Sequence, residues 1–233
     1  MQSAEFDRYV ADYERQHRES IRLSGEGTGY FAEYKVRELA RLAAAWGLEA
    51  PRILDFGAGM GNSLPAFRRH FRDRRIVMAD VSAESLRMAR SLHGGDEPQM
   101  LIRDGRLPAE DGSFDIAFTA CVFHHIPEEE HEAWLAELRR VTAVGGHLVI
   151  FEHNPLNPLT RHAVANCPFD ENAVLIRAGT LRSRVAQAGW SRPRTDYQLF
   201  FPAALAKLRV LEPALRRIAL GAQYACHAVN AGA

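Results

Sequence analysis

An aspartate near the end of a short apolar segment is followed by three glycines at alternate positions. Residues 53–56 are Ile-Leu-Asp-Phe, with the acid at Asp55, and Gly57, Gly59 and Gly61 come next. Glycine has no Cβ, so this loop can take positive φ angles and approach a ligand that a side chain would push away. The pattern predicts a strand that leads into a cofactor-binding turn. A dinucleotide fingerprint would need its third glycine at position 62, where the chain has asparagine.

Two further aspartates follow apolar segments downstream. Asp80 ends the segment 75–79, and an acid at the end of a second strand suits two hydrogen bonds to the hydroxyls of a ribose. Ser82 can cap the helix that is expected after it. Asp104 ends a third apolar segment, 99–103. Apolar strands that alternate with helical patterns predict an α/β protein with a parallel sheet, in which the carboxyl ends of the strands form one rim.

These motifs, in this order, resemble those of the class I S-adenosylmethionine (SAM) dependent methyltransferases. The resemblance covers about residues 51–190 and rests on five landmarks within 51–153: the glycine loop, the two acids that end strands, a Phe-Asp pair that opens a fourth strand, and the fifth strand. It implies a methyltransferase activity with SAM as the cofactor and S-adenosylhomocysteine as the product. The cofactor-binding residues that it implies are Asp55, Gly57, Ala58, Gly59, Gly61, Asp80, Val81, Asp104, Gly105 and Cys121.

The resemblance also implies a Rossmann-like sheet of seven mostly parallel strands, with helices on both faces and an antiparallel last strand. Residues 46–233 would form this SAM-binding core, and residues 1–45 an N-terminal helical lid. A helix-like insert, 203–220, would separate the sixth strand from the seventh. The other later elements are expected as a fourth strand at 116–123, a helix at 130–142, a turn at 145–146, a fifth strand at 147–152, a sixth at about 195–201 and a seventh at 221–229.

Residues that could act on a methyl acceptor are expected at the same rim as the glycine loop. His124 and His125 follow the fourth strand, and Glu152 and His153 stand at the end of the fifth. Adjacent residues of an extended chain point to opposite sides, so at most one of His124 and His125 is expected to face the acceptor. A hydroxyl acceptor must lose a proton, and an imidazole titrates near neutral pH. The sequence does not distinguish an acceptor that is methylated at oxygen from one that is methylated at nitrogen or carbon.

The N-terminal segment supplies further candidates. Phe6, Tyr9, Tyr13 and His17 recur at helical spacing, and a glycine-rich hinge follows at 25–29. Such a stripe is typical of the packing face of a helix, and a helix before a flexible hinge also suits a lid over a cofactor. Tyr13 and His17 are therefore candidates for contact with the acceptor.

The segment after the fifth strand resembles one found in a set of bacterial small-molecule methyltransferases. It contains Glu-His-Asn-Pro at 152–155, Asn-Pro-Leu-Thr-Arg at 157–161 and Cys-Pro-Phe-Asp at 167–170. The resemblance implies an acceptor from secondary or cell-envelope metabolism. The two Asn-Pro pairs are equally consistent with a rigid structural loop.

Composition limits the partners. The 29 basic and 29 acidic residues give a formal net charge of +0, so the chain has no overall basic field to recruit nucleic acid. Three cysteines without a Cys-x-x-Cys pair are typical of reduced thiols in a cytoplasmic protein. No apolar stretch approaches the roughly 20 residues of a membrane span. We therefore expect a cytoplasmic protein without a membrane span, with a small-molecule acceptor as its partner and a homodimer left open.

Three alternatives stand beside small-molecule methyl transfer. The His-His-Ile-Pro stretch at 124–127 favours a methyltransferase for a quinone-type or lipid-like ring carbon, and the domain could also bind SAM without catalysis as a partner of another protein. A NAD-dependent reductase is disfavoured by the residue at position 62 and by the lack of a Tyr-x-x-x-Lys pair. No metal site is expected, because the two histidines are adjacent and no carboxylate cluster accompanies them.

Overall fold

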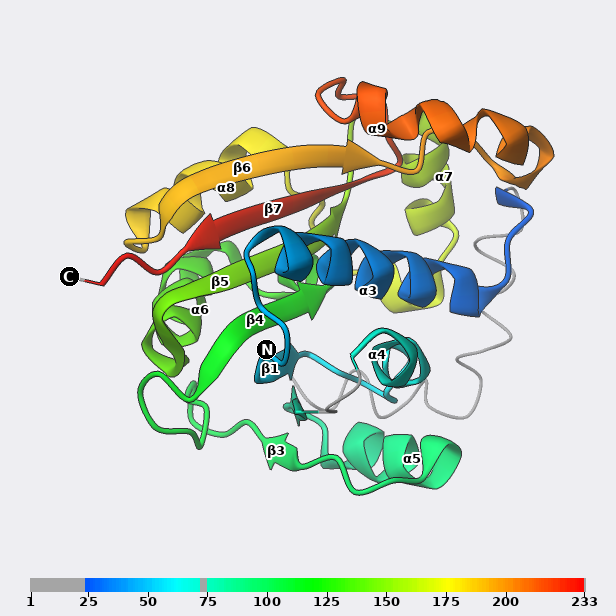
Figure 1. The fold of residues 1–233 in the computed structure, drawn as a ribbon. Coiled ribbons are helices and arrows are strands. Elements are labelled where there is room, and N and C mark those ends of the chain that lie inside the picture. Colours follow the sequence, from blue (N-terminus) through cyan, green and yellow to red (C-terminus); the bar gives the residue numbers. More distant parts are fainter. Residues whose placement is uncertain (1–23, 72–74, 233) are drawn as a thin grey trace.

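A seven-stranded sheet runs through the centre of the molecule in a computed structural model that describes residues 24–71 and 75–232 (Figure 1). The strand order is β3-β2-β1-β4-β5-β7-β6. β7 is antiparallel to its neighbours β5 and β6, whereas the pairs among β1 to β5 are parallel. The expected Rossmann-like sheet with an antiparallel last strand is confirmed. Its strands are β1 (Ile53–Phe56), β2 (Ile76–Asp80), β3 (Gln99–Leu101), β4 (Phe114–Ala120), β5 (Thr142–His153), β6 (Ser191–Gln198) and β7 (Gln223–Val229).

Helices cover both faces of this sheet (Figure 1). All four residues of β1 are buried, as expected for a parallel strand between two helix layers. The α-helices are α3 (Thr28–Ala45), α4 (Leu64–His70), α5 (Ala83–His93), α6 (His131–Val141), α7 (Pro158–Ala165), α8 (Ala178–Gln187) and α9 (Glu212–Leu215). Short 3-10 helices are η2 (Phe123–His125), η3 (Glu128–Glu130), η4 (Pro168–Asp170) and η5 (Ala203–Leu211).

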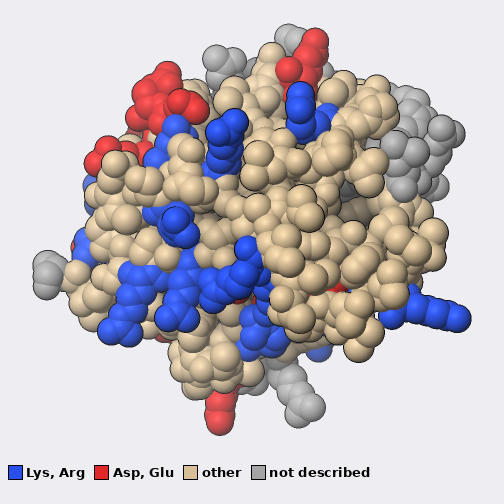
Figure 2. Space-filling model, turned by 90° about the horizontal axis from the view of Figure 1, so that it is seen from above, with Lys and Arg blue, Asp and Glu red and all other residues tan. Residues whose placement is uncertain are grey.

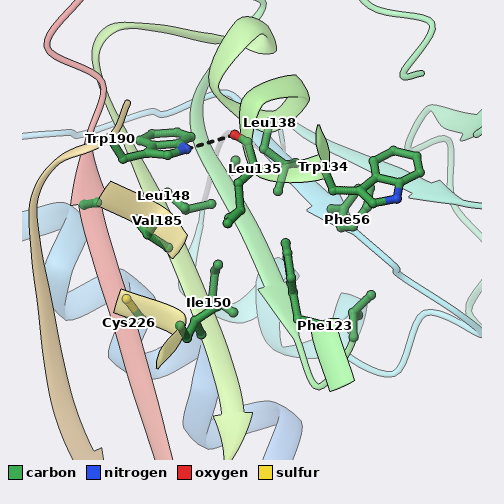
Figure 3. Packing of buried hydrophobic residues seen from close by; sticks show 14 of the residues in the cluster. Phe56, Phe123, Trp134, Leu135, Leu138, Leu148, Ile150, Val185, Trp190 and Cys226 are labelled. Carbon is green, nitrogen blue, oxygen red and sulfur yellow. Dashed lines mark hydrogen bonds between the residues drawn. The ribbon is translucent and has the colours of Figure 1, made fainter. Parts of the chain in front are cut away.

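One helix layer consists of α6 and α8. Leu148 and Ile150 of β5 pack with Leu135 of α6 and Val185 of α8 in one apolar cluster (Figure 3). The indole N–H of Trp190 donates a hydrogen bond of 2.9 Å to the carbonyl oxygen of Leu135, which satisfies the polar atom of a buried aromatic side chain. This layer supports β4 and β5, whose carboxyl ends carry the predicted acceptor residues.

The other layer includes α3, α4 and α5, and Leu86 and Ala89 of α5 pack with Leu64 of α4. Val149 and Phe151, the alternate residues of β5, join a second apolar cluster with Leu39 of α3 and Phe67 of α4. Successive side chains of β5 point to opposite faces of the sheet, so this strand packs against both helix layers. Helix α3 is part of the packed core, although it falls within the segment 1–45 that was expected as a lid. The rest of that lid, up to residue 23, lies outside the described residues.

The glycine pair at 145–146 is not the expected turn. It lies within β5, which begins at Thr142. The pairing of β5 with β4 shifts its register between Phe114 and Ile116, as at a β-bulge. A Cβ on Gly146 would lie 2.8 Å from the carbonyl oxygen of Asp115. Glycine is therefore needed here for the close approach of two backbones rather than for chain reversal.

Other boundaries also differ from the expected ones. β4 ends at Ala120, and residue 123, expected in that strand, opens η2. β6 covers Ser191–Gln198 rather than about 195–201, and α3 begins inside the expected hinge. The insert at 203–220 contains the short helices η5 and α9, as expected. No helix in the described part of the chain combines the length and apolar character that a membrane span requires.

Candidate active site

The glycine loop follows β1 and is held to the end of β2 by hydrogen bonds. The Gly57 N–H donates to the carbonyl oxygen of Ala79 at 2.8 Å, and the Gly59 N–H donates to the Asp80 carboxylate at 2.8 Å. The second oxygen of Asp80 accepts from the Ser82 N–H at 2.8 Å. Asp80 therefore organises both the glycine loop and the start of α5.

Gly57→Ala is expected to destabilise the fold by about 3 kcal/mol. Gly57 has a φ of +75°, which costs a residue with a Cβ about 1–2 kcal/mol, and its Cβ would lie 2.4 Å from Cγ2 of Val122, an overlap that adds about 1–3 kcal/mol. Gly59→Ala is the matched control, because Gly59 has a φ of +53° and no atom within 4 Å of its Cβ position. Urea unfolding should show a clearly smaller loss for Gly59→Ala; equal losses would contradict the steric argument.

A pocket of about 370 Å³ opens beside the loop, within the size range of ligand sites. Its wall includes most of the predicted site residues. Those expected to bind the cofactor are Asp55, Gly57, Ala58, Gly59, Asp80 and Cys121, and those expected near the acceptor are His124, His125 and His153. The structure thus brings the cofactor candidates and the acceptor candidates into one cavity.

The remaining candidates lie elsewhere. Glu152 is fully buried and contacts His124 rather than lining the pocket. The predicted cofactor residues that do not line the pocket are Gly61, Val81, Asp104 and Gly105. Of these, Asp104 and Gly105 are exposed beyond β3, so their cofactor roles stay predictions. Tyr13 and His17 lie outside the described residues.

Asp55 is a buried acid in the pocket wall. Its side chain lies near that of Asp80, and burial together with the charge of Asp80 raises the pKa of Asp55 to about 7. A cationic group bound beside this carboxyl would favour its ionised form. SAM carries a sulfonium and an ammonium group, so the electrostatics of the pocket suit this cofactor.

His124 and His125 both line the pocket, which corrects the expectation that they point to opposite sides. They lie in η2 rather than in extended chain, and their ring centroids are 4.2 Å apart. His124 donates from Nδ1 to Glu152 Oε2 at 2.5 Å, and Glu152 also accepts from the backbone N–H groups of Val122 and Phe123. One buried carboxylate therefore holds the turn that carries both histidines.

Asp170 of η4 completes this cluster, and its role was not predicted. Its Oδ1 lies 3.5 Å from His124 Nε2 and 3.4 Å from His125 Nε2. Burial opposes ionisation of Asp170, but the two histidines outweigh it and hold the pKa of this carboxyl well below its usual range. The expectation of no carboxylate cluster beside the histidines did not foresee Asp170, which comes close to them because the chain after β5 folds back over η2. The only sequence signal was an acid within the Cys-Pro-Phe-Asp stretch.

The two histidines differ in their electrostatics. Burial would lower the pKa of His124, but Glu152 and Asp170 raise it well above the ordinary value. Burial dominates at His125 and lowers its pKa. Their adjacent positions in the sequence therefore do not make them equivalent groups.

Cys121 lies between β4 and η2 with a φ of +59°. Burial opposes ionisation of this thiol, but Lys35 and His153 lower its pKa to about 7. Lys35 comes from α3 and also lines the pocket. Its contribution could not be seen in the sequence, because it depends on how α3 packs across the sheet.

Much of the remaining wall is apolar. Tyr30 and Phe31 come from α3, Leu159 from α7, and Phe200 and Phe201 from the chain after β6. None of them was singled out as a site residue, although Tyr30 and Leu159 lie in segments that were expected on the acceptor side. These side chains give the pocket wall a large apolar share that suits a hydrophobic ligand.

Lys and Arg side chains gather in a band across one part of the surface shown in Figure 2, while much of the rest of this face is uncharged. The formal net charge of the whole chain is nevertheless +0. The absence of a nucleic-acid partner therefore stays a prediction.

Comparison with known proteins agrees with the fold. Residues 54–150 match the family model described as a methyltransferase domain. A demethylmenaquinone methyltransferase of Deinococcus radiodurans is 31% identical over 173 residues, which are 72% of this chain and 70% of that protein. One of Thermobifida fusca is 34% identical over 128 residues, and this match spans about half of each chain (52%).

Solved structures show the same fold. A SAM-dependent methyltransferase from Thermotoga maritima superposes with a TM-score of 0.69 at 19% identity, covering 98% of this chain and 99% of that one. One from Archaeoglobus fulgidus gives a TM-score of 0.68 at 14% identity, covering 94% and 100%. The fold is that of a Rossmann-like α/β domain with a pocket beside its glycine loop. The chain belongs to the class I SAM-dependent methyltransferases.

Proposed function

We propose that this enzyme transfers the methyl group of SAM to an apolar small molecule whose reacting group lies against the histidine side of the pocket. The observation that carries the proposal is the shared cavity. Its wall holds Asp55, the glycine loop and Asp80 together with His124, His125 and several apolar side chains. A cofactor and an acceptor that bind in this cavity can therefore contact each other directly.

Methyl transfer from SAM requires the protein mainly to position the reacting atoms. A nucleophilic atom of the acceptor attacks the methyl carbon in line, the C–S bond breaks, and its electron pair stays on sulfur, which becomes a neutral thioether. Holding the reacting atoms about 3 Å apart supplies a large part of the rate. A hydroxyl acceptor also releases its proton. Asp55 and Asp80 supply the negative charge that favours the cationic cofactor over its neutral sulfur product.

Methylation of a quinone-type ring carbon is the second candidate. The apolar wall formed by Tyr30, Phe31, Phe200 and Phe201 favours it, because a hydrophobic ring would be desolvated there. Three relatives are named demethylmenaquinone methyltransferases, which also supports this acceptor class. A fourth, from Azoarcus, is named trans-aconitate 2-methyltransferase, and that acceptor name argues for a polar acid instead.

Calorimetric titration with SAM, S-adenosylhomocysteine and NADH tests the cofactor. We expect binding of the first two and none of NADH; NADH binding alone would overturn the proposal. Transfer of labelled methyl from SAM should then be assayed with apolar phenols, reduced quinones, amines and polar hydroxy acids. Product mass spectrometry separates methylation at oxygen from methylation at carbon. Turnover of amines or hydroxy acids alone would overturn the apolar acceptor, and SAM binding with no turnover of any acceptor would favour a non-catalytic SAM-binding protein.

A further inference from the structure

We infer that His124, His125 and Asp170 form a binding site for one divalent transition-metal ion, with Zn²⁺ as its representative. One ligand atom of each side chain lies within 4.8 Å of the other two. The set of two imidazoles and one carboxylate matches first-row transition metals, whereas Mg²⁺ and Ca²⁺ prefer oxygen ligands alone.

The spacing of the ligand atoms fits a shared ion better than direct hydrogen bonds. Asp170 Oδ1 is 3.5 Å from His124 Nε2 and 3.4 Å from His125 Nε2. Good N–H···O hydrogen bonds are shorter, about 2.7–3.2 Å. Two ligands of a tetrahedral ion with bonds of about 2.0–2.1 Å are about 3.3–3.4 Å apart. Both pairs therefore have the separation that one tetrahedral ion would impose.

The surroundings of His124 also match those of a metal ligand. Its Nδ1 is engaged by the buried Glu152 carboxylate at 2.5 Å, which leaves Nε2 as the nitrogen that faces Asp170. A carboxylate on the far nitrogen fixes the tautomer and ring orientation of metal-binding histidines. Glu152 is itself held by two backbone N–H groups, so this orientation is rigid.

The cluster is accessible from the pocket. His124, His125 and Asp170 all line it, and the side chains of His125 and Asp170 are each 13% exposed. Three protein ligands leave a coordination position for a small molecule, as in catalytic rather than structural zinc sites. A ligand that entered the pocket could therefore reach the ion directly.

The role of the ion rests on the proposed function, although its binding does not. An acceptor hydroxyl that coordinates a divalent ion loses its proton to solvent more readily. The resulting oxygen lone pair would attack the methyl carbon of SAM, and the C–S electron pair would pass to sulfur. The site would thus select acceptors that carry a metal-coordinating oxygen, such as phenols and hydroquinones.

The test is calorimetric titration of chelator-treated full-length protein with Zn²⁺, Co²⁺ and Mg²⁺, with metal content measured after dialysis. We expect one equivalent of Zn²⁺, a visible absorption band from bound Co²⁺, and no Mg²⁺ binding. Asp170→Asn should weaken Zn²⁺ binding at least tenfold, and Glu152→Gln about 10- to 100-fold through loss of ligand orientation. If Asp170→Asn does not fold, His125→Asn replaces it.

Asp196→Asn is the matched control. Asp196 Oδ2 lies 3.4 Å from His227 Nε2, with similar side-chain exposure, but outside the pocket and without a second histidine in the pair. It should leave Zn²⁺ binding unchanged. Wild-type protein without Zn²⁺ or Co²⁺ binding, or an Asp170→Asn variant that retains it in full, would overturn the inference. SAM binding measured on the same samples separates this result from failure of the proposed function.

Discussion

Asp80→Ala is expected to weaken SAM binding by about 100-fold. Asp80 accepts hydrogen bonds from the backbone N–H groups of Gly59 and Ser82, so its removal releases the glycine loop. The family resemblance adds a contact with the ribose hydroxyls. Hydrogen bonds to a charged group contribute about 1.5–3 kcal/mol each, and about 3 kcal/mol corresponds to a factor of about 100 in affinity.

Calorimetry with SAM measures this loss, and Asp96→Ala is its control. Asp96 is an exposed acid in the loop after α5, so its removal changes the net charge equally without touching the pocket. We expect Asp96→Ala to bind SAM as the wild-type protein does. An Asp80→Ala variant with unchanged affinity would refute the assignment of Asp80 to the cofactor.

Asp55→Asn is expected to stabilise the ligand-free protein at about pH 8 by up to about 4 kcal/mol. The pKa of Asp55 is about 7 in the folded chain and 3.8 in the reference state. The folded protein therefore binds the proton more tightly, and stability falls as the pH rises from about 4 to 7. A pKa change of this size corresponds to about 4 kcal/mol. Asparagine removes the buried charge, so the gain should be small at about pH 4.

Urea unfolding at about pH 4 and about pH 8 measures this difference. A gain of the same size at both values would contradict the role of the carboxyl charge.

The same variant should bind SAM more weakly, because the cationic cofactor loses an anionic partner. In the wild-type protein, SAM affinity should fall as the pH drops below about 7 and Asp55 becomes protonated. In Asp55→Asn this dependence should be lost. Calorimetry across this pH range checks the prediction; parallel pH profiles in both proteins would assign the dependence to another group. If the dependence is lost in Asp55→Asn as expected, the Asp55 carboxyl lowers the stability of the ligand-free fold but raises its affinity for a cation.

The sequence by itself determined the features that depend on neighbouring residues. The glycine loop, the strand that ends at Asp80 and the helix capped by Ser82 were all predicted, and the Ser82 hydroxyl does accept from the Ser85 N–H at 3.0 Å. Glycine spacing, apolar periodicity and a capping residue act over a few residues. Local patterns of this kind placed the cofactor side of the pocket at one rim of the sheet.

Only the tertiary structure decided the acceptor side of the pocket. Asp170 lies close to the histidines, and the charge of Lys35 lowers the pKa of Cys121, because segments far apart in the chain pack together. The 3-10 turn of η2, held by the buried Glu152, directs His124 and His125 into the same pocket. Long-range packing and buried polar contacts set these positions, and neither leaves a periodic pattern in the sequence. The electrostatics at the acceptor side therefore follow from contacts between distant segments, whereas the cofactor loop follows from local sequence.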